Sequence, residues 1–132
     1  MANLLMYWQN GSFQARLYLC NIVFMEKGTD KILVLTTCPG SITAKQISQD
    51  LVANRLAACV NILPGIQSYF RWGNKVDFAD EFLLIIKTTA DLYKEVEKSI
   101  NQLHPHELPE IIAVPIEAGL PEYLSWIKDN TK

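Results

Sequence analysis

Two histidines and two glutamates lie close together in the stretch LHPHELPE, residues 103–110. They are His104, His106, Glu107 and Glu110, and the chain has no other histidine. Imidazoles and carboxylates bind divalent transition metals, and the same groups act as acids and bases in catalysis. The stretch therefore suggests a metal site, an acid–base site, or a polar corner between a helix and a strand.

The spacing of the histidines favours chelation. His104 and His106 flank a proline, and residues two apart in an extended segment can point to the same side. Two imidazoles make only half of a metal site, so the fold must supply a third ligand from Glu107, Glu110 or Cys38. The structural alternative is that His104 donates to a backbone carbonyl while Glu110 caps or pairs at the start of a strand.

A second polar and aromatic set stands at the ends of predicted strands. Its members are Lys87, Asn61, Tyr69 and Trp72. Together with His104 and Glu110 they are expected to line a cleft between subunits that holds an anionic or polar metabolite. The alternative is that Lys87 is solvated or pairs with a carboxylate while the aromatic rings pack. No nucleophile–base pair or glycine-rich phosphate loop is present, so we do not expect an enzyme.

Composition limits the classes of function. A chain of 132 residues with 49% hydrophobic residues suits one domain with an apolar core. Its net charge of −2 argues against nucleic-acid binding, even though SYFRWGNK mixes aromatic and basic residues. There is no apolar run long enough to span a membrane. Three widely spaced cysteines (Cys20, Cys38 and Cys59) form no disulfide framework, which favours the cytoplasm.

Residues 1–24 differ from the remainder of the chain. They mix apolar, aromatic and polar residues without a clean period, and Arg16 follows the first apolar patch. A signal peptide places its charge before a continuous apolar core. We therefore expect an extension of unknown role over 1–24, with a weak targeting peptide as the alternative, and a domain over 25–132.

The elements that position these groups follow from the hydrophobic pattern. Strands are predicted over 31–38, 56–65, 75–89 and 110–116, and a partly alternating segment over 66–72 leads into a hairpin turn at Gly73-Asn74. A helix capped by Ser41 runs to about residue 55, a second one capped by Asp91 ends at His104-Pro105, and a short one starts near Pro121. The order β-α-β-β-α-β predicts an α+β, ferredoxin-like sandwich with a short C-terminal helix.

The run FLLIIK, residues 82–87, does not alternate between apolar and polar residues. One face of the predicted sheet is covered by the two helices, so a strand that is apolar on both sides needs cover on its other face. We expect a homo-oligomer whose sheets pack on each other.

Three strings resemble the CutA family of divalent-cation tolerance proteins: RLAACVNILPGIQSYFRW, EFLLIIKTT and LHPHELPEIIAVPIEAGLPEYLSWI. The resemblance runs from about Ile32 to Thr131. It implies a ferredoxin-like subunit, similar to the nitrogen-regulatory PII proteins, in a tight homotrimer associated with copper and other divalent cations. Metal binding, signalling and support of membrane proteins have all been proposed for the family.

The family's proposed metal ligands are a cysteine, a histidine and a glutamate. By position these become Thr36, Leu103 and Glu110 here, so only the glutamate is kept. His106 stands where the family usually has tyrosine. The candidate metal set of this chain is Cys38, His104, His106 and Glu110.

The leading hypothesis is thus a cytoplasmic homotrimer that binds a divalent cation, copper first, and takes part in metal tolerance. The cation is not expected to be required for folding. The alternative is a PII-like regulatory trimer that binds a small ligand or an unknown protein partner in clefts between subunits.

Overall fold

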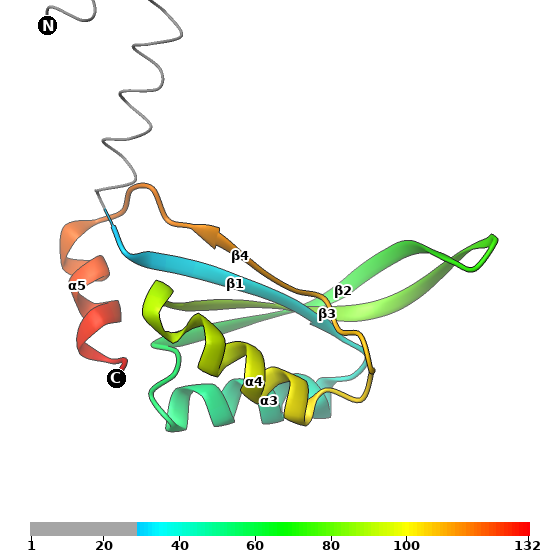
Figure 1. The fold of residues 1–132 in the computed structure, drawn as a ribbon, viewed down its shortest axis with the longest axis horizontal. Coiled ribbons are helices and arrows are strands. Elements are labelled where there is room, and N and C mark those ends of the chain that lie inside the picture. The colour runs from blue at the N-terminus through cyan, green and yellow to red at the C-terminus, as the bar shows by residue number, and fades with distance from the viewer. Residues whose placement is uncertain (1–28) are drawn as a thin grey trace, which may run out of the picture.

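The protein folds as a four-stranded antiparallel sheet with two helices on one face (Figure 1), as seen in a computed structural model that describes residues 29–132. The elements are β1 (Lys31–Cys38), α3 (Ser41–Ala53), β2 (Cys59–Trp72), β3 (Lys75–Thr89), the short 3-10 helix η1 (Ala90–Leu92), α4 (Tyr93–Leu103), β4 (Ile111–Pro115) and α5 (Pro121–Asp129). The strand order is β2-β3-β1-β4. The α+β, ferredoxin-like prediction is confirmed, whereas the extension predicted over 1–24 lies outside the described residues.

The core lies between the sheet and helices α3 and α4. Alternate residues of β1 and β3, such as Val34 and Ile86, are fully buried, because successive strand residues point to opposite faces. Leu51 of α3 and Ile100 of α4 belong to the same core, each on the apolar face of its helix. The helix periods therefore predicted the buried positions, although Leu103 at the end of α4 is partly exposed.

The other side of the sheet is apolar and carries little cover. The strand register places one set of side chains on this side, which we call the open face. Its members are Leu33, Leu35, Leu63, Leu83, Ile85, Ile112 and Val114. Each of them is partly or largely exposed in one protomer. The uniform run FLLIIK thus divides into alternate residues on the core and open faces.

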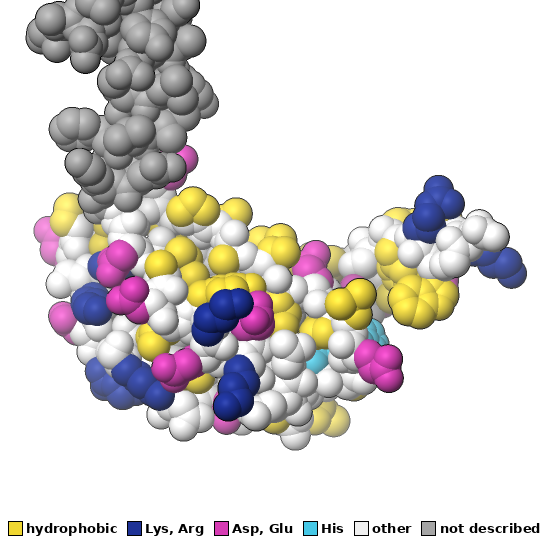
Figure 2. Space-filling view, viewed as in Figure 1, with side chains coloured by type: hydrophobic (Ala, Val, Ile, Leu, Met, Phe, Trp, Pro, Cys, Tyr) yellow, Lys and Arg dark blue, Asp and Glu magenta, His cyan; other side chains and the backbone are white. Residues whose placement is uncertain are grey.

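The β2–β3 hairpin extends beyond the sheet as an arm, residues 66–81 (Figure 1). Tyr69 and Phe78 stack on it with ring centroids 5.6 Å apart, while Trp72 near the turn is 73% exposed. Figure 2 shows hydrophobic surface on the arm next to basic side chains at its tip. Such apolar surface on a projecting hairpin is typical of a segment that packs on another chain.

Three local predictions were wrong. The strand predicted over 56–65 does not end at Pro64-Gly65: it continues through the segment 66–72 as one strand, β2, with an irregularity between Leu63 and Ile66. Pro64 lacks an N–H and Gly65 has a φ of +77°, so the pair interrupts the ladder without ending the strand. Gly40, not Ser41, is the N-cap of α3, and no side chain caps it. Asp91 lies within η1 instead of capping α4.

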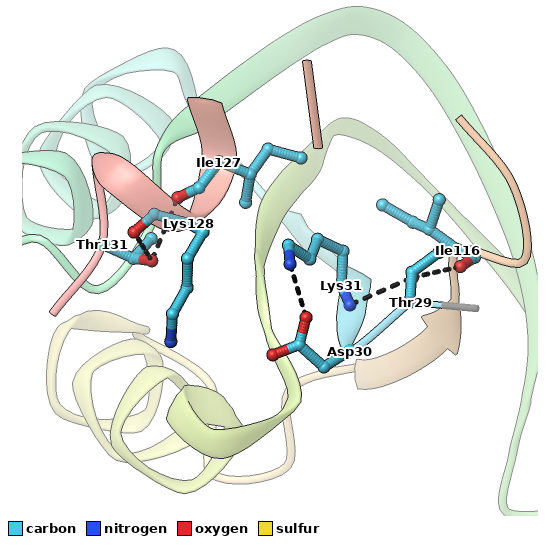
Figure 3. Close-up of polar contacts among 7 residues, drawn as sticks. All are labelled: Thr29, Asp30, Lys31, Ile116, Ile127, Lys128 and Thr131. Carbon is cyan, nitrogen blue, oxygen red and sulfur yellow. Dashed lines mark hydrogen bonds and ion pairs between the residues drawn. The ribbon is translucent and has the colours of Figure 1, made fainter. Parts of the chain in front are cut away.

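Polar contacts tie the start of β1 to the segment before α5 (Figure 3). The Thr29 hydroxyl donates to the Ile116 carbonyl at 2.5 Å and accepts from the Lys31 N–H at 3.1 Å. The Lys31 ammonium lies 2.5 Å from the Asp30 carboxylate, and this hydrogen bond lowers the pKa of Asp30. Over residues 29–132, no helix is both long and apolar enough to cross a membrane.

Candidate functional site

His104 is held in place by both of its ring nitrogens. The proline after it ends α4, and His104 adopts an extended conformation as the C-cap. Its Nε2 lies 2.7 Å from the Thr37 carbonyl oxygen, and its Nδ1 lies 3.1 Å from the His106 backbone nitrogen. A carbonyl only accepts, so Nε2 carries the proton and Nδ1 accepts the His106 N–H. The ring is therefore buried with both nitrogens bonded, in agreement with the alternative in which His104 donates to a backbone carbonyl.

His106 has an exposed side chain in the loop between α4 and β4. Its ring centroid is 5.0 Å from that of His104. Glu107 and Glu110 are also exposed, and Figure 2 shows histidine surface close to the base of the arm. In the part of the chain that the structure describes, no three His, Cys, Asp or Glu side chains come close enough to hold a metal ion. The metal set remains a prediction, because the described residues of one protomer do not bring three of its members together.

Cys38 is buried at the end of β1, on the face opposite to the open face. Its Sγ lies 3.9 Å from the Gly40 carbonyl oxygen. Burial raises the pKa of the Cys38 thiol, and the negative charge of Glu81 raises it further. Metals and electrophiles react with the thiolate, so a buried thiol with a raised pKa is a poor ligand and a poor nucleophile.

We expect Cys38 in the native protein to react with iodoacetamide at pH 7.5 at least about tenfold more slowly than in the unfolded protein. The thiol is both covered and protonated, and unfolding removes both protections. Peptide mass spectrometry of samples labelled in buffer and in urea measures the ratio. Equal labelling in the two conditions would contradict the described burial.

Lys87 and Asn61 form a polar corner on the side of the sheet that carries the open face. Lys87 lies directly opposite Cys59 in the β2–β3 register. Its ammonium donates to the Asn61 carboxamide oxygen and lies 3.7 Å from the Cys59 sulfur. Cys59 and Asn61 are two residues apart on β2, and such residues share a face of the sheet. This spacing could have identified Cys59 as the third member of the Lys87–Asn61 corner.

The predicted ligand cleft is divided between two places in one protomer. Tyr69 and Trp72 lie on the arm, whereas Asn61 and Lys87 lie in the body of the sheet. About 35 Å of extended chain separates Asn61 from Trp72, at about 3.3 Å per residue. Within one protomer these four side chains therefore form no common cleft. Sequence reasoning also missed the Thr37 carbonyl, because a backbone acceptor carries no sequence signal.

Comparison with known proteins places this geometry in a family. The sequence model of the CutA1 divalent ion tolerance protein matches residues 32–130. The divalent-cation tolerance protein CutA of Thermus thermophilus is 44% identical over 99 residues, which cover 75% of this chain and 96% of the relative. The chloroplastic protein CutA of Arabidopsis thaliana is 41% identical over 106 residues, covering 80% of this chain and 58% of the relative.

The fold agrees with that assignment. The crystal structure of CutA from Xylella fastidiosa superposes with a TM-score of 0.77 at 44% identity, covering 79% of this chain and all of that one. The matched region contains the sheet, both covering helices, the arm and the histidine loop. From Ile32 to Asn130, this chain is a member of the CutA1 divalent ion tolerance protein family.

Proposed function

We propose that the chain acts as a cytoplasmic homotrimer in divalent-cation tolerance and binds a divalent cation, with copper as the first candidate. Family membership over residues 32–130 is the observation that carries this proposal. We propose a binding role and no catalysis. We do not expect the cation to be required for folding.

The open face and the arm support the assembly. In one protomer they expose large apolar side chains, including Ile112 at 50% and Phe78 at 57%. A continuous patch of this kind is unusual on a monomer, and a second copy supplies an equally apolar surface to cover it. Sheet packing on the open face, with the arm reaching a neighbouring copy, would also bring the two halves of the predicted ligand cleft together.

His106 and Glu110 are the groups through which we propose that the cation binds. Both are exposed, and Cu(II) has a high affinity for imidazole. The ring nitrogens of His104 are already engaged, so His104 would position the loop through its bond from the His106 N–H. The remaining ligands would come from a neighbouring copy.

Titration of the purified protein with Cu(II) and Zn(II) tests the metal proposal. We expect stoichiometric Cu(II) binding that weakens at least about tenfold in His106→Ala and is kept in Glu122→Ala, a control that removes an exposed carboxylate on α5. Isothermal calorimetry measures both affinities. Cu(II) binding no tighter than that of an unrelated protein with surface histidines would rule out a specific site.

The alternative function is a regulatory trimer that binds a small ligand or a protein partner in its subunit clefts. The Lys87–Asn61 corner is the observation that favours it. Both functions require the assembly, so a stable folded monomer in equilibrium sedimentation would contradict both.

A further inference from the structure

The Lys87 ammonium lies among apolar side chains. In the strand register Lys87 is opposite Leu33 of β1, and Ile85 precedes it on the same face of β3. The side chain is partly buried in one protomer. A lysine in the middle of a surface that another copy covers loses water that it would otherwise keep.

Lys87 also lacks a counter-charge among the residues that the structure describes. Among residues 29–132, ion pairs within 4.0 Å involve Lys31, Lys94 and Lys132, and none involves Lys87. Its partners are the neutral carboxamide oxygen of Asn61 and the sulfur of Cys59. Lys31 of β1 lies on the same face of the sheet as Lys87, but its ammonium has the Asp30 carboxylate at 2.5 Å. Burying an unpaired ammonium is strongly unfavourable unless a negative charge compensates it.

The corner offers nitrogen donors and carries no carboxylate. Lysine carries three N–H donors, of which one points to the Asn61 oxygen and a second to the Cys59 sulfur, so one remains. Because the Asn61 oxygen accepts that bond, the amide Nδ2 and its two donors remain for another group. Two adjacent nitrogen donors, one of them charged, suit the oxygen atoms of an anion and repel a cation.

We infer that Lys87 and Asn61 bind a small anion, a carboxylate or a phosphate, where two copies of the chain meet. This inference rests on the homotrimer proposed above and names the ligand class of its subunit cleft. The anion supplies the charge that makes closure over Lys87 favourable, so anion binding and assembly stabilise each other. The sequence has no glycine-rich phosphate loop, which fits a small anion better than a nucleotide.

Thermal unfolding in phosphate, succinate or chloride at equal ionic strength tests this site, with sedimentation velocity on the same samples. For the unmodified protein we expect a saturable rise in Tm of about 4 °C or more over chloride in phosphate, succinate or both. The control Lys45→Met, at an exposed lysine of α3, should respond equally. Lys87→Met should lose the response, and its trimer in chloride should be at least as stable as the unmodified one.

A second variant, Asn61→Asp, tests the site if Lys87→Met folds poorly. Asn61→Asp places a carboxylate beside the ammonium, so it should raise Tm in chloride and remove the anion response. A response to phosphate alone, or to succinate alone, identifies the class of ligand.

A trimer with no response beyond chloride, or the same response in Lys87→Met, would overturn the inference while leaving the assembly intact. A trimeric Lys87→Met that is less stable in chloride would show that a neighbouring carboxylate already pairs with Lys87, which also overturns it. A monomer in every buffer would instead refute the assembly, and the interfacial site with it.

Discussion

Replacing Ile85 with glutamate is expected to convert the proposed trimer into folded monomers. Ile85 lies on the open face, between Leu35 of β1 and Asn61 of β2. In a monomer the new carboxylate can reach water, because Ile85 is only partly buried by residues 29–132. In the assembly one unpaired carboxylate per copy would be buried against apolar neighbours. The free-energy cost of burying these charges exceeds the free energy gained by forming the interface.

Sedimentation velocity measures this change directly, because the chain has a mass of 15.0 kDa and the trimer three times that mass. Circular dichroism on the same samples shows whether the dissociated chain keeps its fold. Ile42→Glu is the matched control, because Ile42 on α3 is 74% exposed and lies away from the sheet. If Ile85→Glu sedimented like the unmodified protein, the open face would not be the subunit interface.

Replacing Ile100 with alanine is expected to lower the free energy of unfolding by about 2–5 kcal/mol. Ile100 is fully buried on α4 and belongs to the core between the helices and the sheet. The substitution removes its contacts and leaves a cavity that rigid strands cannot fill. The effect should appear whatever the chain binds, because it acts on the core and not on a surface.

Urea unfolding at one fixed chain concentration gives the measurement, since the stability of an assembly depends on concentration. Ile42→Ala makes a similar chemical change at an exposed helix position and should change the free energy of unfolding by less than about 0.5 kcal/mol. Equal losses for Ile100→Ala and Ile42→Ala would contradict the packing of α4 on the sheet.

The fold was largely predictable because its hydrophobic periods are clear. Helical spacing in α4 identified Val96 and Ile100 as buried, and the bounds of β1 and β3 were predicted correctly. The errors fell where backbone conformation decides. Pro64-Gly65 looked like the end of a strand, yet Gly65 allows a positive φ and β2 continues past it.

The candidate sites were less predictable than the fold. His104 and His106 look alike in the sequence, but one is buried with both ring nitrogens bonded and the other is exposed. That difference depends on the Thr37 carbonyl, which β1 brings to the end of α4. Lys87 and Asn61, by contrast, do meet in the structure, because β2 and β3 pair along one hairpin, while the ligand cleft to which they were assigned stays a prediction.

By itself, the sequence determined the element order, the apolar character of both sheet faces and the family. These features depend only on local hydrophobic periods and on the order of short motifs along the chain. Only the tertiary structure decided which apolar residues face the helices and which remain uncovered. It also separated the arm aromatics from Lys87 and tied His104 to Thr37. These outcomes depend on strand register and on contacts between residues distant in the chain, and neither is contained in any local pattern.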